Sequence, residues 1–157
     1  MAVRFLKAKS MTDTREAVRA FLESQSTLAL ATVNAAGQAE VTPLFYVSDE
    51  AFNLCWLSSP DSRHSLNLAT HPRVAAAIYP AVWNWQDIRG LQIEGEAAAV
   101  GDEVKRRQIL ARYLEKFPLP AAFTQQINAS VLYMLKPHWM RWLDNGVRFG
   151  YKAEINL

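Results

Sequence analysis

Residues 27–57 read TLALATVNAAGQAEVTPLFYVSDEAFNLCWL, and this stretch decides the fold class. The segments Ala35-Ala36-Gly37-Gln38 and Ser48-Asp49-Glu50 are typical of turns. They separate three short runs of β-branched and apolar residues, which cover 27–33, 39–47 and 51–57. Short strands joined by tight turns predict an antiparallel sheet rather than a parallel α/β sheet.

The rest of the chain continues this pattern. Pro43 lies inside the second run, which indicates an edge strand, a bulge, or backbone that faces a ligand. Asn145-Gly146 is the strongest hairpin signal in the chain. Further strands are expected at residues 74–79, 88–100, 131–136, 139–144 and 147–151. The sequence therefore predicts a mainly β protein built as an antiparallel barrel with peripheral helices.

Three helices are expected beside these strands. The first starts near Asp13, whose spacing to Glu16 is that of a capping box. The second covers about residues 62–70 and ends at His71, because the following proline disfavours helix in the residue before it. Gly101-Asp102 begins the third, whose buried stripe is expected to be Ile109, Leu110, Tyr113, Leu114 and Phe117.

Length and composition suit one domain, residues 1–157, of which half are apolar. The net charge of +2 indicates neither a nucleic-acid partner nor a membrane surface, and the apolar runs are too short to span a bilayer. The first ten residues are basic but lack the apolar core of a secretory signal, and Cys55 has no second cysteine for an internal disulfide. We therefore expect a soluble, cytoplasmic protein.

Several kinds of site are excluded by missing motifs. The three histidines, at 64, 71 and 138, do not have the spacing of metal ligands, so no metal is expected. Neither a Gly-x-Gly-x-x-Gly nor a Walker-type loop is present, and Gly-x-Ser-x-Gly is missing too. Rossmann and P-loop nucleotide binding and hydrolase-type acyl transfer are therefore not expected.

Residues 58–64 carry the remaining site chemistry. Hydroxyl groups, an arginine and an imidazole come together there, at the start of the helix expected at 62–70. A helix N-terminus offers free N–H groups, and an arginine offers a bidentate fork to phosphate oxygens. The same residues suit a plain N-cap followed by a solvated arginine equally well. A phosphate cradle and a structural cap both stay open at this point.

Three motifs then occur in a specific order: Ser58 with Ser62-Arg63-His64, His71-Pro72-Arg73-Val74, and the strand Arg89-Gly90-Leu91-Gln92-Ile93-Glu94-Gly95-Glu96. In this order and spacing they resemble the pyridoxamine 5′-phosphate oxidase-like FMN-binding split-barrel family. The likeness runs from about residue 27 to residue 152. It implies an antiparallel split β-barrel that forms a homodimer and holds FMN non-covalently at the subunit interface.

The resemblance also implies which residues hold the flavin. Arg63 would grip the phosphate, and His64 stands where the family has a lysine, so its charge would depend on pH. The strand 41–46 would border the isoalloxazine ring, and Gln92 would replace a glutamine that the family has at the position of Gly90. The implied cofactor-binding set is Thr42, Pro43, Leu44, Phe45, Ser58, Ser59, Ser62, Arg63, His64, Gln92, Trp142 and Lys152.

The C-terminal segment departs from the family pattern, in which a tryptophan precedes Arg-x-His-x-Arg. The matching residues here are Trp142, Arg148, Gly150 and Lys152. Trp142 and Lys152 would reach the flavin across the dimer, and Arg148 would bind an anionic substrate. Because glycine has replaced the histidine of the substrate pair, the resemblance does not extend to the pyridoxamine phosphate oxidase reaction itself.

Three functional hypotheses follow. The first is an FMN-dependent oxidoreductase that acts on a small-molecule substrate or electron donor. The second is a non-catalytic flavin-binding or flavin-sensing module, which the loss at Gly150 favours. The third is a split barrel that binds haem or a deazaflavin, in which case His64, His71 or His138 would be the axial ligand of a haem.

Overall fold

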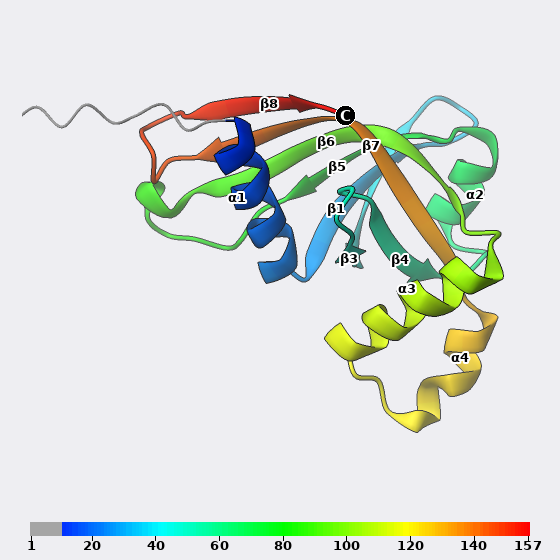
Figure 1. Ribbon diagram of the computed structural model, residues 1–157. Coiled ribbons are helices and arrows are strands. Elements are labelled where there is room, and N and C mark those ends of the chain that lie inside the picture. Colours follow the sequence, from blue (N-terminus) through cyan, green and yellow to red (C-terminus); the bar gives the residue numbers. More distant parts are fainter. Residues whose placement is uncertain (1–10) are drawn as a thin grey trace, which may run out of the picture.

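The computed structural model describes residues 11–157 and has one curled antiparallel sheet with helices at its edges (Figure 1). The sheet order is β2-β1-β5-β6-β7-β4-β3, and β8 pairs with β7. The strands are β1 (Thr27–Val33), β2 (Ala39–Phe45), β3 (Val47–Ser48), β4 (Leu54–Ser58), β5 (Arg73–Ile78), β6 (Arg89–Ala99), β7 (Val131–Asp144) and β8 (Lys152–Asn156). This arrangement confirms the mainly β, split-barrel fold class.

The helices of the described residues lie at the periphery of the sheet (Figure 1). They are α1 (Met11–Ser24), α2 (Arg63–Thr70), α3 (Glu103–Lys116) and α4 (Thr124–Ala129), with short 3-10 turns η1 (Trp85–Asp87) and η2 (Ala121–Phe123). None of the helices in residues 11–157 has the length and apolar character needed to cross a membrane.

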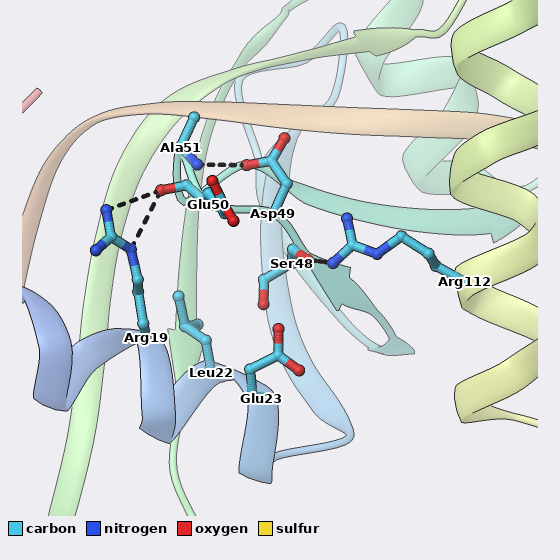
Figure 2. Close-up of a pocket in the computed structure, with 8 residues that line it drawn as sticks. All are labelled: Arg19, Leu22, Glu23, Ser48, Asp49, Glu50, Ala51 and Arg112. Carbon is cyan, nitrogen blue, oxygen red and sulfur yellow. Dashed lines mark hydrogen bonds between the residues drawn. The ribbon is translucent and has the colours of Figure 1, made fainter.

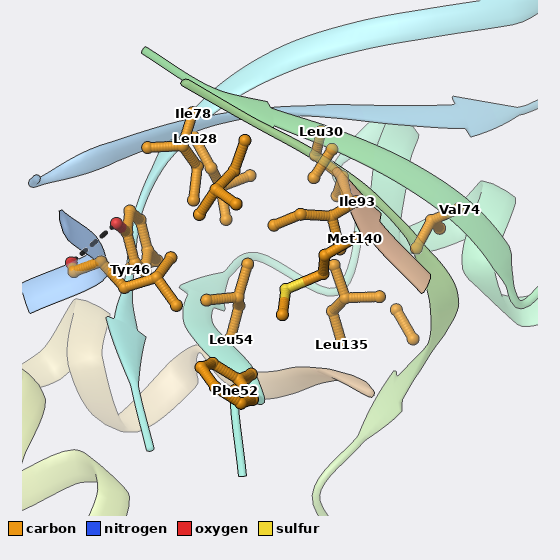
Figure 3. Packing of buried hydrophobic residues seen from close by; sticks show 14 of the residues in the cluster. Leu28, Leu30, Tyr46, Phe52, Leu54, Val74, Ile78, Ile93, Leu135 and Met140 are labelled. Atoms are coloured by element: carbon orange, nitrogen blue, oxygen red, sulfur yellow. Dashed lines mark hydrogen bonds between the residues drawn. The ribbon is translucent and has the colours of Figure 1, made fainter. Parts of the chain in front are cut away.

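The main core fills the inside of the curled sheet. Alternate residues of β1 point inward, so Leu28 and Leu30 are buried while the residues between them face outward. Figure 3 shows these leucines meeting Ile78, Ile93 and Met140 from three other strands. Each such side chain contributes about 1.5–3 kcal/mol on burial. This alternation therefore drives the sheet to curl around one apolar interior.

Helix α1 closes one end of this interior. Its buried face consists of Thr14, Val18, Phe21 and Leu22, and the Phe21 ring lies 4.9 Å from that of Trp142. The described helix begins at Met11, so Asp13 lies in its first turn rather than at the expected cap. An acidic side chain in the first turn still suits the positive end of the helix dipole.

A second apolar cluster lies under α3. Ile109 and Tyr113 are buried there against β3, β4 and β7, while Leu110, Leu114 and Phe117 of the expected stripe are only partly buried. Asp102 caps the helix by accepting hydrogen bonds from the amides of Val104 and Lys105. The expected start of this helix is therefore confirmed.

The two strands expected at 131–136 and 139–144 are a single strand, β7. Pro137 does not interrupt it, because the pairing shifts there: Glu94 lies opposite Trp139 and Gly95 lies opposite Pro137. A Cβ on Gly95 would come 2.3 Å from the Lys136 carbonyl oxygen. Glycine thus allows β6 to approach β7 closely at the bulge.

The strand expected at 147–151 is wrong, since β8 begins only at Lys152. The side chain of Asn145 holds the intervening residues as a loop: its amide donates to the Trp85 carbonyl, and its oxygen accepts from the Gly150 amide. Gly150 has a positive φ of 69°, which favours glycine. The Asn-Gly pair therefore begins a longer connection than a two-residue hairpin.

Two other strand limits also differ from expectation. The run 39–47 is divided at Tyr46, whose buried hydroxyl donates to the Leu22 carbonyl. The run 51–57 starts as a strand only at Leu54, because the Asp49 carboxylate organises the preceding turn by accepting from the amides of Ala51 and Asn53. Polar side chains that bind backbone thus set both limits.

Candidate functional site

The loop before α2 is organised by serine hydroxyls. Ser62 is the N-cap, and its Oγ lies 2.9 Å from the Ser59 carbonyl oxygen and 2.8 Å from Ser65 Oγ. Ser65 Oγ also donates to the Ser59 carbonyl. The structural-cap interpretation of this loop is therefore confirmed, and it leaves the phosphate-cradle interpretation open because the two are compatible.

His64 lies against the end of β4. Its Nε2 is 2.6 Å from Ser58 Oγ and 3.1 Å from Ser62 Oγ. Partial burial lowers the pKa of the imidazole, because burial disfavours the charged form. His64 is therefore a neutral hydrogen-bonding group at neutral pH, where the family has a lysine.

Glu40 is the centre of a network that the sequence analysis missed. Its carboxylate accepts hydrogen bonds from Arg63 Nη2, from Asn34 Nδ2 at 3.0 Å and from Asn67 Nδ2 at 2.9 Å. The Asn67 and Asn34 bonds are the chief reasons why the pKa of this carboxyl is lowered. Arg63, expected to be free for a phosphate, thus already forms an ion pair.

A sequence signal for this network existed. Thr32 continues the buried series Leu28 and Leu30, although its side chain is polar, and it lies opposite Glu40 in the β1–β2 register. Its hydroxyl accepts a hydrogen bond from the buried Asn67 amide at 3.0 Å. A polar residue at a buried strand position needs a hydrogen-bond partner, so Thr32 signals a polar group nearby, which is Asn67 of α2.

These residues surround a cavity of about 350 Å³ between β2 and α2. It brings together four residues of the implied cofactor-binding set with Val41, from the strand expected to border the flavin ring, and two residues that were not predicted. Its lining is Thr32, Glu40, Val41, Thr42, Ser62, Arg63 and His64. We call this cavity the cradle. It offers hydroxyl, imidazole and guanidinium donors beside one carboxylate.

A second cavity, of about 540 Å³, lies on the outer face of the sheet. Its floor is flat because alanines pair across β1 and β5, Ala29 with Ala77 and Ala31 with Ala75. Gln92, Glu94, Trp139 and Arg141 form the opposite side, and Val41 lines both this cavity and the cradle. We call this surface the platform; it places the predicted Gln92 beside a flat apolar floor.

Some predicted residues lie elsewhere within the subunit. Trp142 is 2% exposed and packs inside the barrel, so within this subunit its ring does not reach the platform. The Phe45 and Phe117 rings lie 4.7 Å apart in a tilted arrangement, and Leu44 packs against the core. Pro43 is exposed on β2, which lies at the edge of the sheet, so the edge-strand interpretation holds.

Arg148 and Lys152 are exposed at the other end of the sheet. The β5 strand runs from α2, beside the cradle, to the loop that precedes β6, and residues 145–151 contact that loop through Asn145. Figure 1 shows α2 and the β7–β8 connection at opposite ends of the molecule. The Arg148 guanidinium lies over the Tyr151 ring at 5.6 Å. A single subunit therefore does not bring either cation to the cradle.

A further cavity, of about 550 Å³, lies between α1, the turn at 48–51 and α3 (Figure 2). Its two arginines serve the fold: Arg19 donates to the Glu50 carbonyl and Arg112 to the Ser48 carbonyl. None of the sequence-predicted site residues lines it. We regard it as a structural cleft between two helices and a turn.

Metal and thiol chemistry find little support in the described residues. Within residues 11–157, His, Cys, Asp and Glu side chains do not gather in threes as a metal site would require. Burial raises the pKa of the Cys55 thiol to about 12, so it stays protonated and unreactive.

Known structures share this fold. A conserved hypothetical protein from Mycobacterium tuberculosis superimposes with a TM-score of 0.73 at 20% identity, covering 94% of this chain and 92% of the other. A heme-binding protein from Mycobacterium smegmatis gives 0.74 at 19%, covering 96% of this chain and 59% of the other. HutZ, the heme storage protein from Vibrio cholerae, gives 0.66 at 24%, covering 78% and 88%.

At these identities the structural matches establish the fold alone. No curated protein is detectably similar to the chain in sequence. The sequence profile of the family described as pyridoxamine 5′-phosphate oxidase matches residues 14–143, which include most of α1, the cradle, the platform and nearly all of β7. The chain therefore belongs to the pyridoxamine 5′-phosphate oxidase family.

Proposed function

We propose that this protein binds FMN along the cradle and the platform and acts as a flavin-dependent oxidoreductase on a small-molecule substrate. The observation that carries the proposal is that Val41 lines both cavities, so the cradle and the platform adjoin. One of them holds an arginine and hydroxyl groups, and the other has a floor lined by alanines. A ligand with a phosphate at one end and a planar ring at the other matches this sequence of surfaces.

The donor groups of the cradle fit a phosphate. The side chain of Arg63 is 81% exposed, and only one of its terminal nitrogens binds Glu40, so the rest of the fork is open to a ligand. The hydroxyls of Thr42 and Ser62 lie in the same cavity. At the platform, β2 is an edge strand, and its free side offers backbone groups to the amide-like edge of a flavin.

The redox chemistry would come from the flavin, which accepts and returns a hydride when it is bound. The chain itself would position the cofactor and exclude water from the platform. A homodimer would complete this arrangement, because a two-fold axis through the platform would bring Arg148 and Lys152 of one subunit towards the cradle of the other. Arg148 would then orient an anionic substrate.

The test is an absorption titration of the purified protein with FMN. We expect about one flavin per subunit to remain after removal of unbound FMN and to be released on denaturation. Oxidoreductase function is tested separately by anaerobic reduction with nicotinamide nucleotides. A protein that takes up no FMN would refute the proposal, and one that binds FMN without turnover would support a flavin-sensing role.

Haem is a second candidate, and the positions of two histidines favour it. His64 lines the cradle, and the His138 ring lies 3.9 Å from the Glu94 carboxylate, which lines the platform. Two structurally similar proteins bear names that refer to haem. A neutral imidazole is the usual axial ligand. A Soret band after addition of hemin, lost in His64→Ala or in His138→Ala, would establish this alternative.

A further inference from the structure

The cradle contains a carboxylate at the place where a phosphate-binding site needs positive charge. Arg63 is the only cation among the described residues that line the cavity, and its guanidinium is paired with Glu40. His64 does not add a second charge at neutral pH, because burial favours its neutral form. The formal charge of the cradle is therefore close to zero.

The position of this carboxylate is set by buried groups. Asn67 is 7% exposed and Thr32 is 2% exposed, and the Asn67 amide connects the Thr32 hydroxyl to one Glu40 oxygen. Asn34 donates to the other oxygen from the end of β1. Glu40 would keep both amide donors if Arg63 turned to a ligand. The negative charge is thus a built part of the cradle.

We infer that Glu40 is a specificity-determining residue, which limits how strongly this site prefers a phosphorylated flavin over a non-phosphorylated one. The inference rests on the proposed flavin site. Glu40 engages part of the Arg63 fork and repels a phosphate dianion in the same cavity. Neither effect acts on riboflavin, which has a neutral hydroxyl in place of the phosphate. The wild-type protein should therefore bind FMN only modestly more tightly than riboflavin.

The experiment compares the Kd values of FMN and riboflavin for the wild-type protein and for Glu40→Gln, by fluorescence quenching at fixed ionic strength. We expect the ratio of the riboflavin Kd to the FMN Kd to rise about tenfold in the variant, as for one charge-assisted hydrogen bond made available to the ligand. Riboflavin affinity should change little, and it reports whether the platform is intact.

Two further variants sharpen the result. The amide introduced by Glu40→Gln could compete with the asparagine donors. Glu40→Ala avoids this, because water can accept hydrogen bonds from those donors in the alanine variant. Glu103→Gln removes a carboxylate from another exposed Arg pair, Glu103 with Arg106 on α3, and should leave the ratio unchanged.

The outcomes separate the two proposals. A ratio that rises in both Glu40 variants supports the inference. A ratio that stays the same overturns the inference. A ratio that falls because FMN binding alone weakens also overturns it, and makes Glu40 a residue that positions Arg63. If the wild-type protein binds neither flavin, the proposed function fails before the role of Glu40 is reached.

Discussion

At the scale of single residues, the site depends on which polar side chains face one another. Arg63 and Glu40 come from elements separated by 23 positions in the sequence, yet they share one cavity. His64 Nε2 has two serine partners, Ser58 at the end of β4 and Ser62 at the N-cap of α2. Charge and hydrogen bonding at these few positions decide what the cradle accepts.

Replacing Arg63 by alanine should weaken FMN binding by about 1.5–3 kcal/mol, the range for a hydrogen bond to a charged group. The measurement is a fluorescence titration with FMN. Arg106→Ala, which removes an arginine from an ion pair on α3, is the matched control and should bind normally. If the Arg63 variant retains wild-type affinity, the phosphate does not lie in the cradle.

His64 should make stability depend on pH. Because the pKa of His64 is lowered in the folded state, the unfolded chain binds more protons than the folded chain between the folded and the unfolded pKa. The stability that the neutral imidazole contributes is therefore complete above about pH 6.5, the ordinary histidine pKa. It is lost as the pH falls from that value through the lowered folded-state pKa. Urea unfolding at pH 7.5 and 5.5 should show a larger loss for the wild type than for His64→Gln.

This comparison isolates one group, because His71 and His138 are present in both proteins. Equal losses in the two proteins would mean that His64 is as free to be protonated in the folded state as in the unfolded one.

At the scale of elements, the bulge between β6 and β7 allows one long strand to continue past a proline. The register shift at Glu94 and Gly95 accommodates Pro137 without ending β7. The shift also keeps Trp139 and Arg141 on the platform while Met140 and Trp142 stay in the core. A local irregularity thus determines which aromatic side chain lines the platform.

Gly95→Ala should destabilise the fold by about 1–3 kcal/mol, the usual cost of overpacking, because its Cβ would meet backbone atoms of Lys136. Gly101→Ala is the control, since a Cβ there would meet nothing within 4 Å. The midpoints of urea unfolding measure both. An unchanged midpoint for Gly95→Ala would show that β6 and β7 can separate at the bulge at little cost.

At the scale of the whole molecule, the proposed dimer would bring the platform of one subunit together with the far end of the sheet of the other. The alanine floor is flat and open, while Arg148 and Lys152 lie beyond the other end of β5. A two-fold axis over the floor would place each end over the partner's cradle.

If the proposed dimer and flavin site exist, Ala75→Glu, which puts a charge on this floor, should convert the dimer to a monomer and reduce FMN uptake. Sedimentation velocity measures the first effect and flavin content the second. Ala111→Glu, at an exposed position of α3, should remain dimeric. A wild-type protein that sediments as a monomer would show that the platform of one subunit binds flavin without a partner or does not bind it.

Most strands and helices were predictable because their signals are local. The alternation in residues 27–33, the cap at Ser62 and the cap at Asp102 each depend on neighbours a few residues away. The edge position, one of the three alternatives that Pro43 left open, and the fold class expected from the short strands are both confirmed. The sequence alone thus indicated the fold class, most of the elements and, through the family resemblance, four of the residues that line the cradle.

The polar network of the cradle and the placement of the tryptophans depend on contacts that form only in the folded chain. The pairing of Thr32 with Glu40 follows from strand register, and the contact of Glu40 with Asn67 follows from the packing of α2 on β1. The burial of Trp142, the position of the half-buried Trp139 on the platform and the late start of β8 likewise depend on the bulge and on a loop contact across 60 positions. Local periodicity contains no information on such distant neighbours, because they meet only when the sheet curls.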